Sequence, residues 1–353
     1  MIYVSLIVAF VAALVLTPLV KRLAFRIGAV DAPNYRKVHA RIMPRLGGLA
    51  IYLAFMIGII LLKLVTNFQS DYLYAILVAA TIIVITGVID DMREISAKAK
   101  MIGQIIAACI VVFVGDIQIQ MINLPFGAGE LEFGWVGIPL TIIWIVGITN
   151  AINLIDGLDG LAAGVSTIAL ITLAAMAMIM GNGIVIAMGA ILAAATIGFL
   201  FFNFHPAKIF MGDTGALFLG FMIAVLSLLG FKNVAVISFV IPVIMLGVPI
   251  SDTFFAIVRR LRTGKKWSDP DKSHLHHCLL NMGFSHRQTV LLIYAMASVF
   301  GAVSILFSMS TVWGAILIIA VLLVAIELLV EFIGLAGKNY KPLINFITRN
   351  HNE

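Results

Sequence analysis

The chain has 353 residues, of which 62% are hydrophobic and only 11% are charged. A soluble domain carries about 25% charged residues, so this composition excludes an ordinary soluble protein and indicates one that lies in a membrane. The net charge of +6 does not indicate a nucleic-acid partner, because the positive residues are confined to particular loops.

Apolar runs of about 20 residues, long enough for a helix to cross a bilayer, recur along the whole chain. They predict eleven membrane-spanning helices, at residues 2–22, 47–66, 72–89, 99–115, 135–152, 161–180, 183–202, 215–231, 234–257, 289–308 and 312–334. All Lys and Arg residues except Lys63 and Lys232 fall in alternate loops, which the positive-inside rule assigns to the cytoplasm. The expected fold is an all-α polytopic membrane protein, one domain over residues 1–353, with its N-terminus outside and its C-terminus in the cytoplasm.

The first cytoplasmic loop, residues 36–48, is rich in basic residues and contains His39. Its positive charge follows from the topology alone. The loop ends on Gly47 and Gly48, at the start of the second span. Such a glycine pair indicates either close helix packing or room for a substrate to approach.

Two adjacent carboxylates, Asp90 and Asp91, end the third span. A helix C-terminus disfavours each negative charge by up to about 1 kcal/mol, and adjacent acids also repel each other. We therefore expect a compensating cation, which Lys98, Lys100 or a metal ion could supply. A solvated acid pair at the membrane surface is the alternative.

Residues 116–134 form the only long connection on the expected outer side. This stretch alternates apolar and polar residues and then passes through a Pro- and Gly-containing turn. The pattern predicts a small external β-hairpin, to which we assign no chemistry.

The connection between the fifth and sixth spans is rich in amides, acids and glycines. It contains Asn150, Asn153, Asp156, Gly157, Asp159 and Gly160. Asp159 could be the N-cap of the sixth helix, but that role does not explain Asn153 and Asp156, which lie near the membrane surface among apolar residues. Because glycines let the backbone approach a ligand closely, a substrate site is the favoured interpretation.

Asp213 follows Gly212 immediately before the eighth span. An N-cap role is again open. The carboxylate could equally bind Mg²⁺, which takes few carboxylates and keeps waters and phosphates as its other ligands.

The longest polar loop, residues 258–288, contains His274, His276 and His277. Three imidazoles in four residues could belong to a zinc site, but no cysteine or further clustered histidine completes it. Beside basic residues such as Arg260 they are better suited to binding phosphate oxygens, and a solvated basic loop is the alternative. The loop closes on Ser285 and Gln288 at capping-box spacing before the tenth span.

Asp252 lies near the inner end of the ninth span. A carboxylate at membrane depth is often functional. A salt bridge with Arg259 or Arg260 would explain it equally well.

Taken in order, these motifs resemble those of the polyprenyl-phosphate N-acetylhexosamine-1-phosphate transferases. The matching residues are Asp90 and Asp91 with Lys98 and Lys100 after them, the segment 150–160, the Phe-Met-Gly-Asp-Thr-Gly sequence at 210–215, and His274-Leu-His276-His277. The His-x-His-His form is similar to the branch that starts teichoic acid, O-antigen and related surface glycans, and most similar to its teichoic-acid initiating type. The muramyl-pentapeptide branch of peptidoglycan synthesis, which has consecutive histidines, is the alternative.

The resemblance implies that N-acetylglucosamine-1-phosphate passes from UDP-N-acetylglucosamine to undecaprenyl phosphate, with UMP as the second product. It also implies Mg²⁺ as cofactor, with Mn²⁺ as a substitute, and a site on the cytoplasmic face of a bacterial inner membrane. The expected partners are the two substrates and the lipid bilayer, and a homodimer is left open.

The resemblance further assigns roles to individual residues. As metal ligands it implies Asp213 and Asn153. As catalytic residues it implies Asp90, which would orient or deprotonate the lipid phosphate, Asp91, which would help to hold the metal–diphosphate assembly, and Lys100, Asp156, Asp159 and His276. As substrate-binding residues it implies His39, Asn150, Asp156, Asp159, Arg260, His274, His276 and His277.

Two other classes of membrane protein share some of these features. A secondary transporter has its polar site near the bilayer midplane, between repeated halves, whereas here the polar residues lie at helix ends on one face. A CDP-alcohol phosphotransferase has paired acids around Asp-Gly, but the Ala-Arg expected after Gly160 is Ala163-Gly164 here, and the later acids are missing.

Overall fold

The computed structural model describes residues 2–31, 42–66, 72–123, 130–230, 237–262, 264, 273–336 and 340–345. Its helices are α1 (Ile2–Ile27), α2 (Gly47–Val65), α3 (Leu73–Arg93), α4 (Ala97–Phe113), α5 (Gly137–Ile155), α6 (Leu161–Met180), α7 (Gly183–Asn203), α8 (Gly212–Gly230), α9 (Ile237–Met245), α10 (Gly247–Arg262), α11 (Leu275–Asn281), α12 (His286–Ser308) and α13 (Val312–Ile333). The remaining elements are β1 (Val30–Asp31), β2 (Met43–Pro44), β3 (Met121–Asn123), β4 (Glu130–Glu132) and the 3-10 turn η2 (Gly134–Val136). The predicted helical character is confirmed in these ranges.

Within the described ranges, nine helices are long and apolar enough to cross a membrane: α1, α2, α3, α5, α6, α7, α8, α12 and α13. Their outer faces carry large apolar side chains, such as Ile7 and Leu317, which are 64% and 65% exposed. A surface so rich in exposed apolar groups is stable in lipid and not in water, so the chain is a multi-pass membrane protein. The other two predicted spans correspond to α4, which has 17 residues, and to α9 with α10. The count of eleven and the orientation stay predictions.

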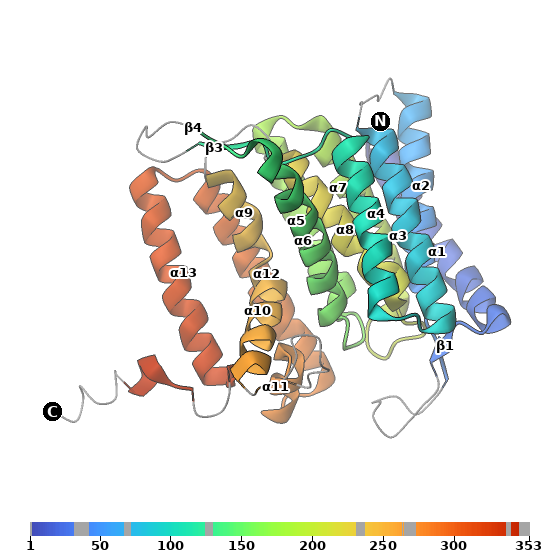
Figure 1. Ribbon diagram of the computed structural model, residues 1–353. Coiled ribbons are helices and arrows are strands. Elements are labelled where there is room, and N and C mark those ends of the chain that lie inside the picture. Colours follow the sequence, from blue (N-terminus) through green and yellow to red (C-terminus); the bar gives the residue numbers. More distant parts are fainter. Residues whose placement is uncertain are drawn as a thin grey trace.

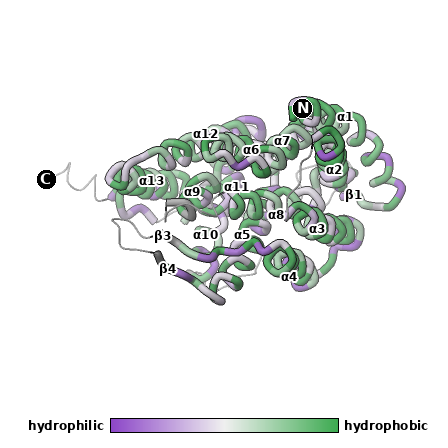
Figure 2. The backbone as a smooth tube through the Cα atoms, turned by 90° about the horizontal axis from the view of Figure 1, so that it is seen from above, coloured by the Kyte–Doolittle hydropathy of each residue, from purple (hydrophilic) through white to green (hydrophobic). Residues whose placement is uncertain are grey.

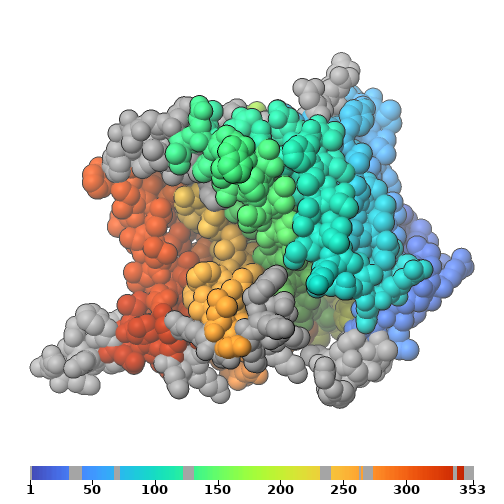
Figure 3. Space-filling view, in the orientation of Figure 1, coloured from blue at the N-terminus to red at the C-terminus, as the bar shows by residue number. Residues whose placement is uncertain are grey.

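Helix α8 lies at the centre of the bundle. It packs against α2, α3, α5 and α6, and Phe218 and Phe221 on it are completely buried. Helices α1 and α13 lie at opposite sides of the molecule (Figure 1), and in the space-filling view the chain colours pass from blue to red between these sides (Figure 3). From above, hydrophobic colouring follows the helices (Figure 2). Because several helices surround α8, its N-terminal end has a defined position.

The predicted ninth span, residues 234–257, is not a single helix. It is divided at Leu246 into α9 and α10, and α10 continues to Arg262. Pro242 and Pro249 lie on either side of the division, and a proline removes one backbone donor and crowds the preceding turn. Both helices contact α12, but α9 packs mainly on α12 whereas α10 packs mainly on α5. The division therefore brings α10 beside the helix that ends in the Asn- and Asp-rich connection.

The connection from α3 to α4, the connection from α5 to α6 and the start of α8 lie at one end of the bundle, together with β1 and α11, whereas β3 and β4 lie at the other end (Figure 1). Strands β3 and β4 pair antiparallel, with Ile122 opposite Leu131, in the stretch where the hairpin is predicted. Residues 124–129 between them lie outside the described residues, and the location of this pair on the outer face stays a prediction.

Candidate active site

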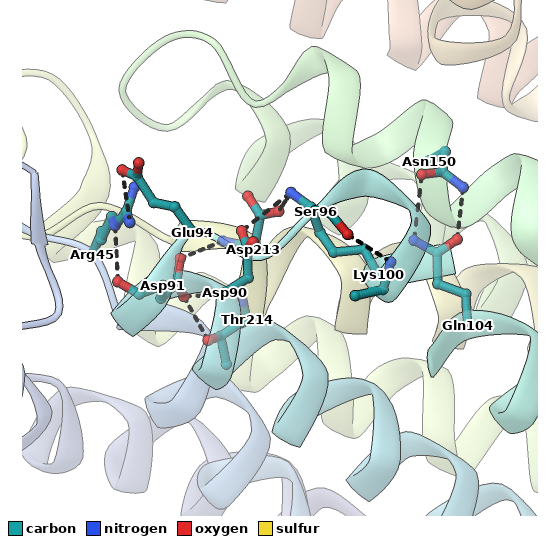
Figure 4. Close-up of polar contacts among 11 residues, drawn as sticks. Arg45, Asp90, Asp91, Glu94, Ser96, Lys100, Gln104, Asn150, Asp213 and Thr214 are labelled. Carbon is teal, nitrogen blue, oxygen red and sulfur yellow. Dashed lines mark hydrogen bonds and ion pairs between the residues drawn. The ribbon is translucent and has the colours of Figure 1, made fainter. Parts of the chain in front are cut away.

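Charged side chains from three helices meet in the candidate site (Figure 4). Lys100, in the first turn of α4, places its Nζ atom 3.1 Å from Asp90 Oδ2 and 2.7 Å from Asp213 Oδ2. Asp90 lies in the last turn of α3 and is 7% exposed. Asp213 lies inside the first turn of α8, so it does not precede the helix as an N-cap. Lys100 is therefore a cation of the kind expected beside the acid pair, whereas Lys98 is exposed.

Asp91 has a different environment from its neighbour Asp90. Its Oδ1 accepts a hydrogen bond from the backbone N–H of Asp213 (2.9 Å), and its Oδ2 accepts from the N–H (3.0 Å) and the hydroxyl (2.6 Å) of Thr214. Asp91 is 2% exposed, and its oxygens satisfy amide groups that the first turn of a helix leaves unpaired. A Cβ on Gly212, whose φ is +71°, would lie 2.5 Å from Asp91 Oδ2, so glycine is required there. The geometry makes Asp91 an anchor for the turn that carries Asp213.

The same turn of α8 is closely packed against two neighbouring helices. A Cβ on Gly48 of α2 would lie 2.0 Å from the backbone nitrogen of Gly215, and one on Gly87 of α3 would lie 2.4 Å from Thr214 Cα. No side chain fits at either contact without moving backbone. Of the two interpretations of the glycine pair before the second span, the structure therefore supports close helix packing.

The end of α5 adds an amide and a further carboxylate to this cluster. The Asn153 side chain is a hydrogen-bonding neighbour of the Asp213 carboxylate. Asp156 follows α5 as its C-cap, and burial together with the nearby carboxylates, that of Asp213 first among them, raises its pKa to about 8. The carboxylates therefore oppose one another's ionisation in the free protein, and a bound cation would relieve this repulsion. Carboxylate oxygens suit a hard divalent cation such as Mg²⁺, so these residues fit the implied metal.

Replacing Asp156 by Asn should make the stability of the free protein less dependent on pH. The pKa of this carboxyl rises from 3.8 to about 8 on folding, so the stability that it contributes is present at low pH and is lost as the pH rises through this window. Asn cannot ionise, so in detergent with a chelator the melting temperature of Asp156→Asn should exceed that of the wild type by an amount that grows between about pH 4 and pH 8. A difference that stays constant or shrinks over this range would contradict the shifted pKa.

The histidine segment packs against the turn that follows Asp156. His274 and His276 are 5% and 3% exposed, and a Cβ on Gly157 would lie 2.3 Å from His276 Nε2. Burial, with the neighbouring His277 next in importance, lowers the pKa of His276 to about 4, so this ring is neutral at pH 7. The structure thus brings the His-x-His-His segment to the acidic cluster, as the proposed site requires.

Asp159 does not cap α6, so the N-cap interpretation of this residue is wrong. The residue before α6 is Gly160, which has a φ of +78° and provides no side-chain cap. Asp159 Oδ2 lies 2.8 Å from His205 Nδ1 and accepts a hydrogen bond from the backbone N–H of Ala207 (3.1 Å). One ligand atom each of Asp159, His205 and His286 lie within 4.8 Å of one another, but the two imidazoles are stacked 4.1 Å apart. The carboxylate therefore ties the start of α6 to the connection before α8.

Three further residues are expected to bind substrate: Asn150 on α5, Arg260 on α10, and His39. Asn150 Nδ2 donates to Gln104 Oε1 (2.6 Å), and Gln104 Nε2 donates to Asn150 Oδ1 (3.3 Å), so the Asn150 amide joins α5 to α4 (Figure 4). Arg260 lies in the last turn of α10. His39 lies outside the described residues. Substrate binding by these residues stays a prediction.

Several contacts of the site involve residues that sequence reasoning missed. Gln104, Thr214 and His205 are of this kind, because a single glutamine, threonine or histidine near a helix end carries no chemical signal of its own. The sequence indicates Asp252 by its depth in the membrane and His274 by its histidine cluster, but it does not indicate that the two side chains are paired. A carboxylate and an imidazole 22 residues apart are brought together by the fold alone.

An apolar groove of about 550 Å³ lies between α5 and α10. It is lined by Ile119, Phe133, Leu140, Ile143, Trp144, Gly147, Ile148, Ala151, Val243, Ile250, Thr253, Phe254 and Ile257. On α5 the lining ends at Ala151, two positions before Asn153, and on α10 Thr253 follows Asp252. Along these two helices, the groove therefore comes within one helical turn of Asn153 and of Asp252.

The chain is similar to known proteins over nearly its whole length. Glycosyl transferase family 4 matches residues 73–231, which include the acid pair and Asp213. The chain is 47% identical over 99% of its length to the "Probable undecaprenyl-phosphate N-acetylglucosaminyl 1-phosphate transferase" of Bacillus subtilis, of which it covers 96%. It is 35% identical over 92% of its length to the "Decaprenyl-phosphate N-acetylglucosaminephosphotransferase" of Mycobacterium tuberculosis, of which it covers 87%. It is 28% identical over 81% of its length to the "Undecaprenyl-phosphate alpha-N-acetylglucosaminyl 1-phosphate transferase" of Salmonella typhi, of which it covers 78%. The chain therefore belongs to the polyprenyl-phosphate N-acetylhexosamine-1-phosphate transferases.

Proposed function

We propose that the chain transfers N-acetylglucosamine-1-phosphate from UDP-N-acetylglucosamine to undecaprenyl phosphate. An oxygen of the acceptor phosphate forms a bond to the β-phosphorus of the nucleotide sugar. The bond from that phosphorus to the bridging oxygen breaks, and UMP leaves with the electron pair. The names of the relatives support a polyprenyl-phosphate acceptor and an N-acetylglucosamine-phosphate group. The UDP donor, the undecaprenyl chain and a role at the start of teichoic-acid or other surface-glycan synthesis belong to this proposal.

The observation that carries the proposal is the meeting of Asp90, Lys100 and Asp213 at one end of the bundle. Phosphoryl transfer depends mainly on positioning and on electrostatic stabilisation of the phosphate oxygens. Opposite charges fixed on three helices can provide both. A lipid phosphate also needs an apolar path for its chain, and we assign the groove between α5 and α10 to that chain.

Asp213 and Asn153 are the residues that would hold Mg²⁺, or Mn²⁺ in its place. When bound, such an ion neutralises charge on the diphosphate and polarises its oxygens. Asp91 holds the first turn of α8 and thereby the position of Asp213. Lys100 has three ammonium hydrogens, so it can donate to a phosphate oxygen while it keeps a carboxylate partner.

Asp90 orients the acceptor phosphate in this scheme. A phosphate monoester has a second pKa of about 6, so it is largely ionised at neutral pH and requires no strong base. Asp156 and Asp159 shape the nucleotide-sugar pocket. His274, His276, His277 and Arg260 contact the diphosphate or the sugar.

We place the reaction at the cytoplasmic face of a bacterial inner membrane. The polar cluster lies at the end of the bundle to which the basic loops belong, and basic loops are retained in the cytoplasm. A nucleotide sugar made in the cytoplasm reaches this face directly.

Release of UMP from the purified protein, given undecaprenyl phosphate and a panel of UDP-sugars, tests the proposed function. We expect release to require both the lipid phosphate and a divalent cation, and to be fastest with UDP-N-acetylglucosamine. If no UDP-sugar yields UMP and the protein instead moves a solute into liposomes, a transporter function would replace the proposal.

Filling the groove at Gly147 should impair long-chain acceptors selectively. A Cβ at this position meets no atom within 4 Å, so a leucine side chain can enter the groove without displacing α5. For Gly147→Leu we expect the KM for undecaprenyl phosphate to rise about tenfold, the effect of losing contact with one or two methylene groups. A short, water-soluble prenyl phosphate should be used as by the wild type.

The matched control is Gly183→Leu, in the first turn of α7, where a Cβ also meets no atom within 4 Å. This residue does not line the groove, so the control should use both acceptors normally. Equal impairment of both acceptors by Gly147→Leu would show that the groove does not hold the lipid chain.

A further inference from the structure

A buried pair of charged and polar groups joins α10 to the histidine segment, outside the acidic cluster. Asp252 Oδ2 lies 2.9 Å from His274 Nδ1, and Asp252 Oδ1 accepts a hydrogen bond from the backbone N–H of Leu275 (2.7 Å). The two side chains are 1% and 5% exposed. A buried carboxylate is costly unless its oxygens are paired, and here each oxygen has a partner.

The two contacts of Asp252 have different consequences. The contact with Leu275 satisfies a backbone donor in the first turn of α11, which the His274 side chain does not cap. The contact with Nδ1 fixes the imidazole of His274. Because a carboxylate only accepts hydrogen bonds, Nδ1 must carry the hydrogen, and Nε2 is the nitrogen that can meet a ligand.

The fixed position of the His274 ring also affects His276, which contacts the turn after α5. The His274 ring is parallel to that of His276, with an interplanar angle of 3° and centroids 6.1 Å apart. His276 in turn packs on Gly157, next to Asp156. The position of Asp252 on α10 therefore determines where the histidine segment meets the turn after α5.

We propose that Asp252 is a positioning residue for sugar-phosphate transfer: it holds the Nδ1–H of His274, so that Nε2 faces the diphosphate of the nucleotide sugar and, once it has taken a proton from solvent, donates to a phosphate oxygen. The carboxylate also balances the imidazolium that forms when His274 binds a phosphate oxygen, as a buried acid does for a histidine partner. This inference rests on the proposed function. Asp252 itself contacts no substrate.

Asp252→Asn separates the orienting role from the capping role. The Asn oxygen can still accept from Leu275, so α11 keeps its cap, but the Asn NH₂ group donates to Nδ1, so His274 meets the phosphate as a neutral ring without the positive charge of the imidazolium. We expect kcat/KM for UDP-N-acetylglucosamine to fall about 10- to 100-fold, as for other changes that disturb the orientation of a ligand-binding histidine. The KM for the lipid phosphate should not change.

The control is Ser251→Ala on the same turn of α10, because the Ser251 hydroxyl donates only to Val248 O of its own helix among the bonds described. This variant should transfer like the wild type. If Asp252→Asn also transferred like the wild type, Asp252 would be only a helix cap and the proposal would be overturned.

A spectroscopic measurement tests the same contact without turnover. Nitrogen-15 chemical shifts of labelled histidine, with the His274 signal assigned from His274→Gln, should show hydrogen on Nδ1 in the wild type and on Nε2 in Asp252→Asn. An unchanged His274 tautomer would overturn the proposal whatever the kinetics. If the wild type released no UMP, the proposed function would fail, while a changed tautomer would still support the orientation of His274 by Asp252.

Discussion

Asp213→Asn should abolish sugar-phosphate transfer while the protein stays folded in detergent. Asn has the same shape as Asp but no charge, so it loses the attraction for a divalent cation and for Lys100 Nζ, which lies 2.7 Å from the carboxylate. We expect kcat to fall by at least about 10²- to 10³-fold, the size of effect that a lost electrostatic contact to phosphoryl or acyl oxygens produces. UMP release with Mg²⁺ at saturating substrates measures it.

The control for this change is Asp116→Asn. Asp116 is exposed and follows the far end of α4, so the substitution removes one negative charge at the opposite end of the bundle from Asp213. It should leave UMP release unchanged. If purified Asp213→Asn kept near-normal turnover, the assignment of Asp213 as the principal metal ligand would be wrong.

Asp91→Ala should lower both the stability of the protein and its affinity for Mg²⁺. The change leaves two backbone N–H groups and the Thr214 hydroxyl without their acceptor, which costs on the order of 3 kcal/mol of unfolding free energy. It also frees the turn that carries Asp213. Loss of such support for a ligand reduces metal affinity about 10- to 100-fold, so more Mg²⁺ should be needed for half-maximal UMP release.

Asp91→Asn distinguishes support from direct chemistry. The amide keeps one oxygen acceptor for the α8 turn, so it should restore part of the lost stability, and excess Mg²⁺ should restore part of the lost turnover. If Asp91→Asn were as stable as the wild type and yet inactive at every Mg²⁺ concentration, Asp91 would act on the substrate itself rather than through Asp213.

The helices were largely predictable from the sequence because lipid allows few alternatives. A spanning segment must pair its own backbone groups, so each apolar run must be helical. The division of the ninth span at Leu246 was not predictable from Pro242 and Pro249, since a membrane helix can also continue past a proline. Whether the helix is divided or continues depends on its tertiary packing, here that of α9 on α12 and of α10 on α5.

The site residues were predictable as a set, but their individual contacts were not. Adjacent residues on a helix point about 100° apart, so Asp90 and Asp91 must face different neighbours. The sequence does not say which one faces α4 and which one faces α8. For the same reason the contacts of Asp159 with His205 and of Asp252 with His274 depend on tertiary packing and have no local signal.

A structure of the protein with Mg²⁺ and UDP-N-acetylglucosamine tests the central claim most directly. We expect the ion about 2.1 Å from an Asp213 oxygen, with the diphosphate between Lys100 and the histidine segment and the β-phosphorus accessible to the acceptor phosphate. A diphosphate bound at the β3–β4 end of the bundle, or an ion held without Asp213, would contradict the account.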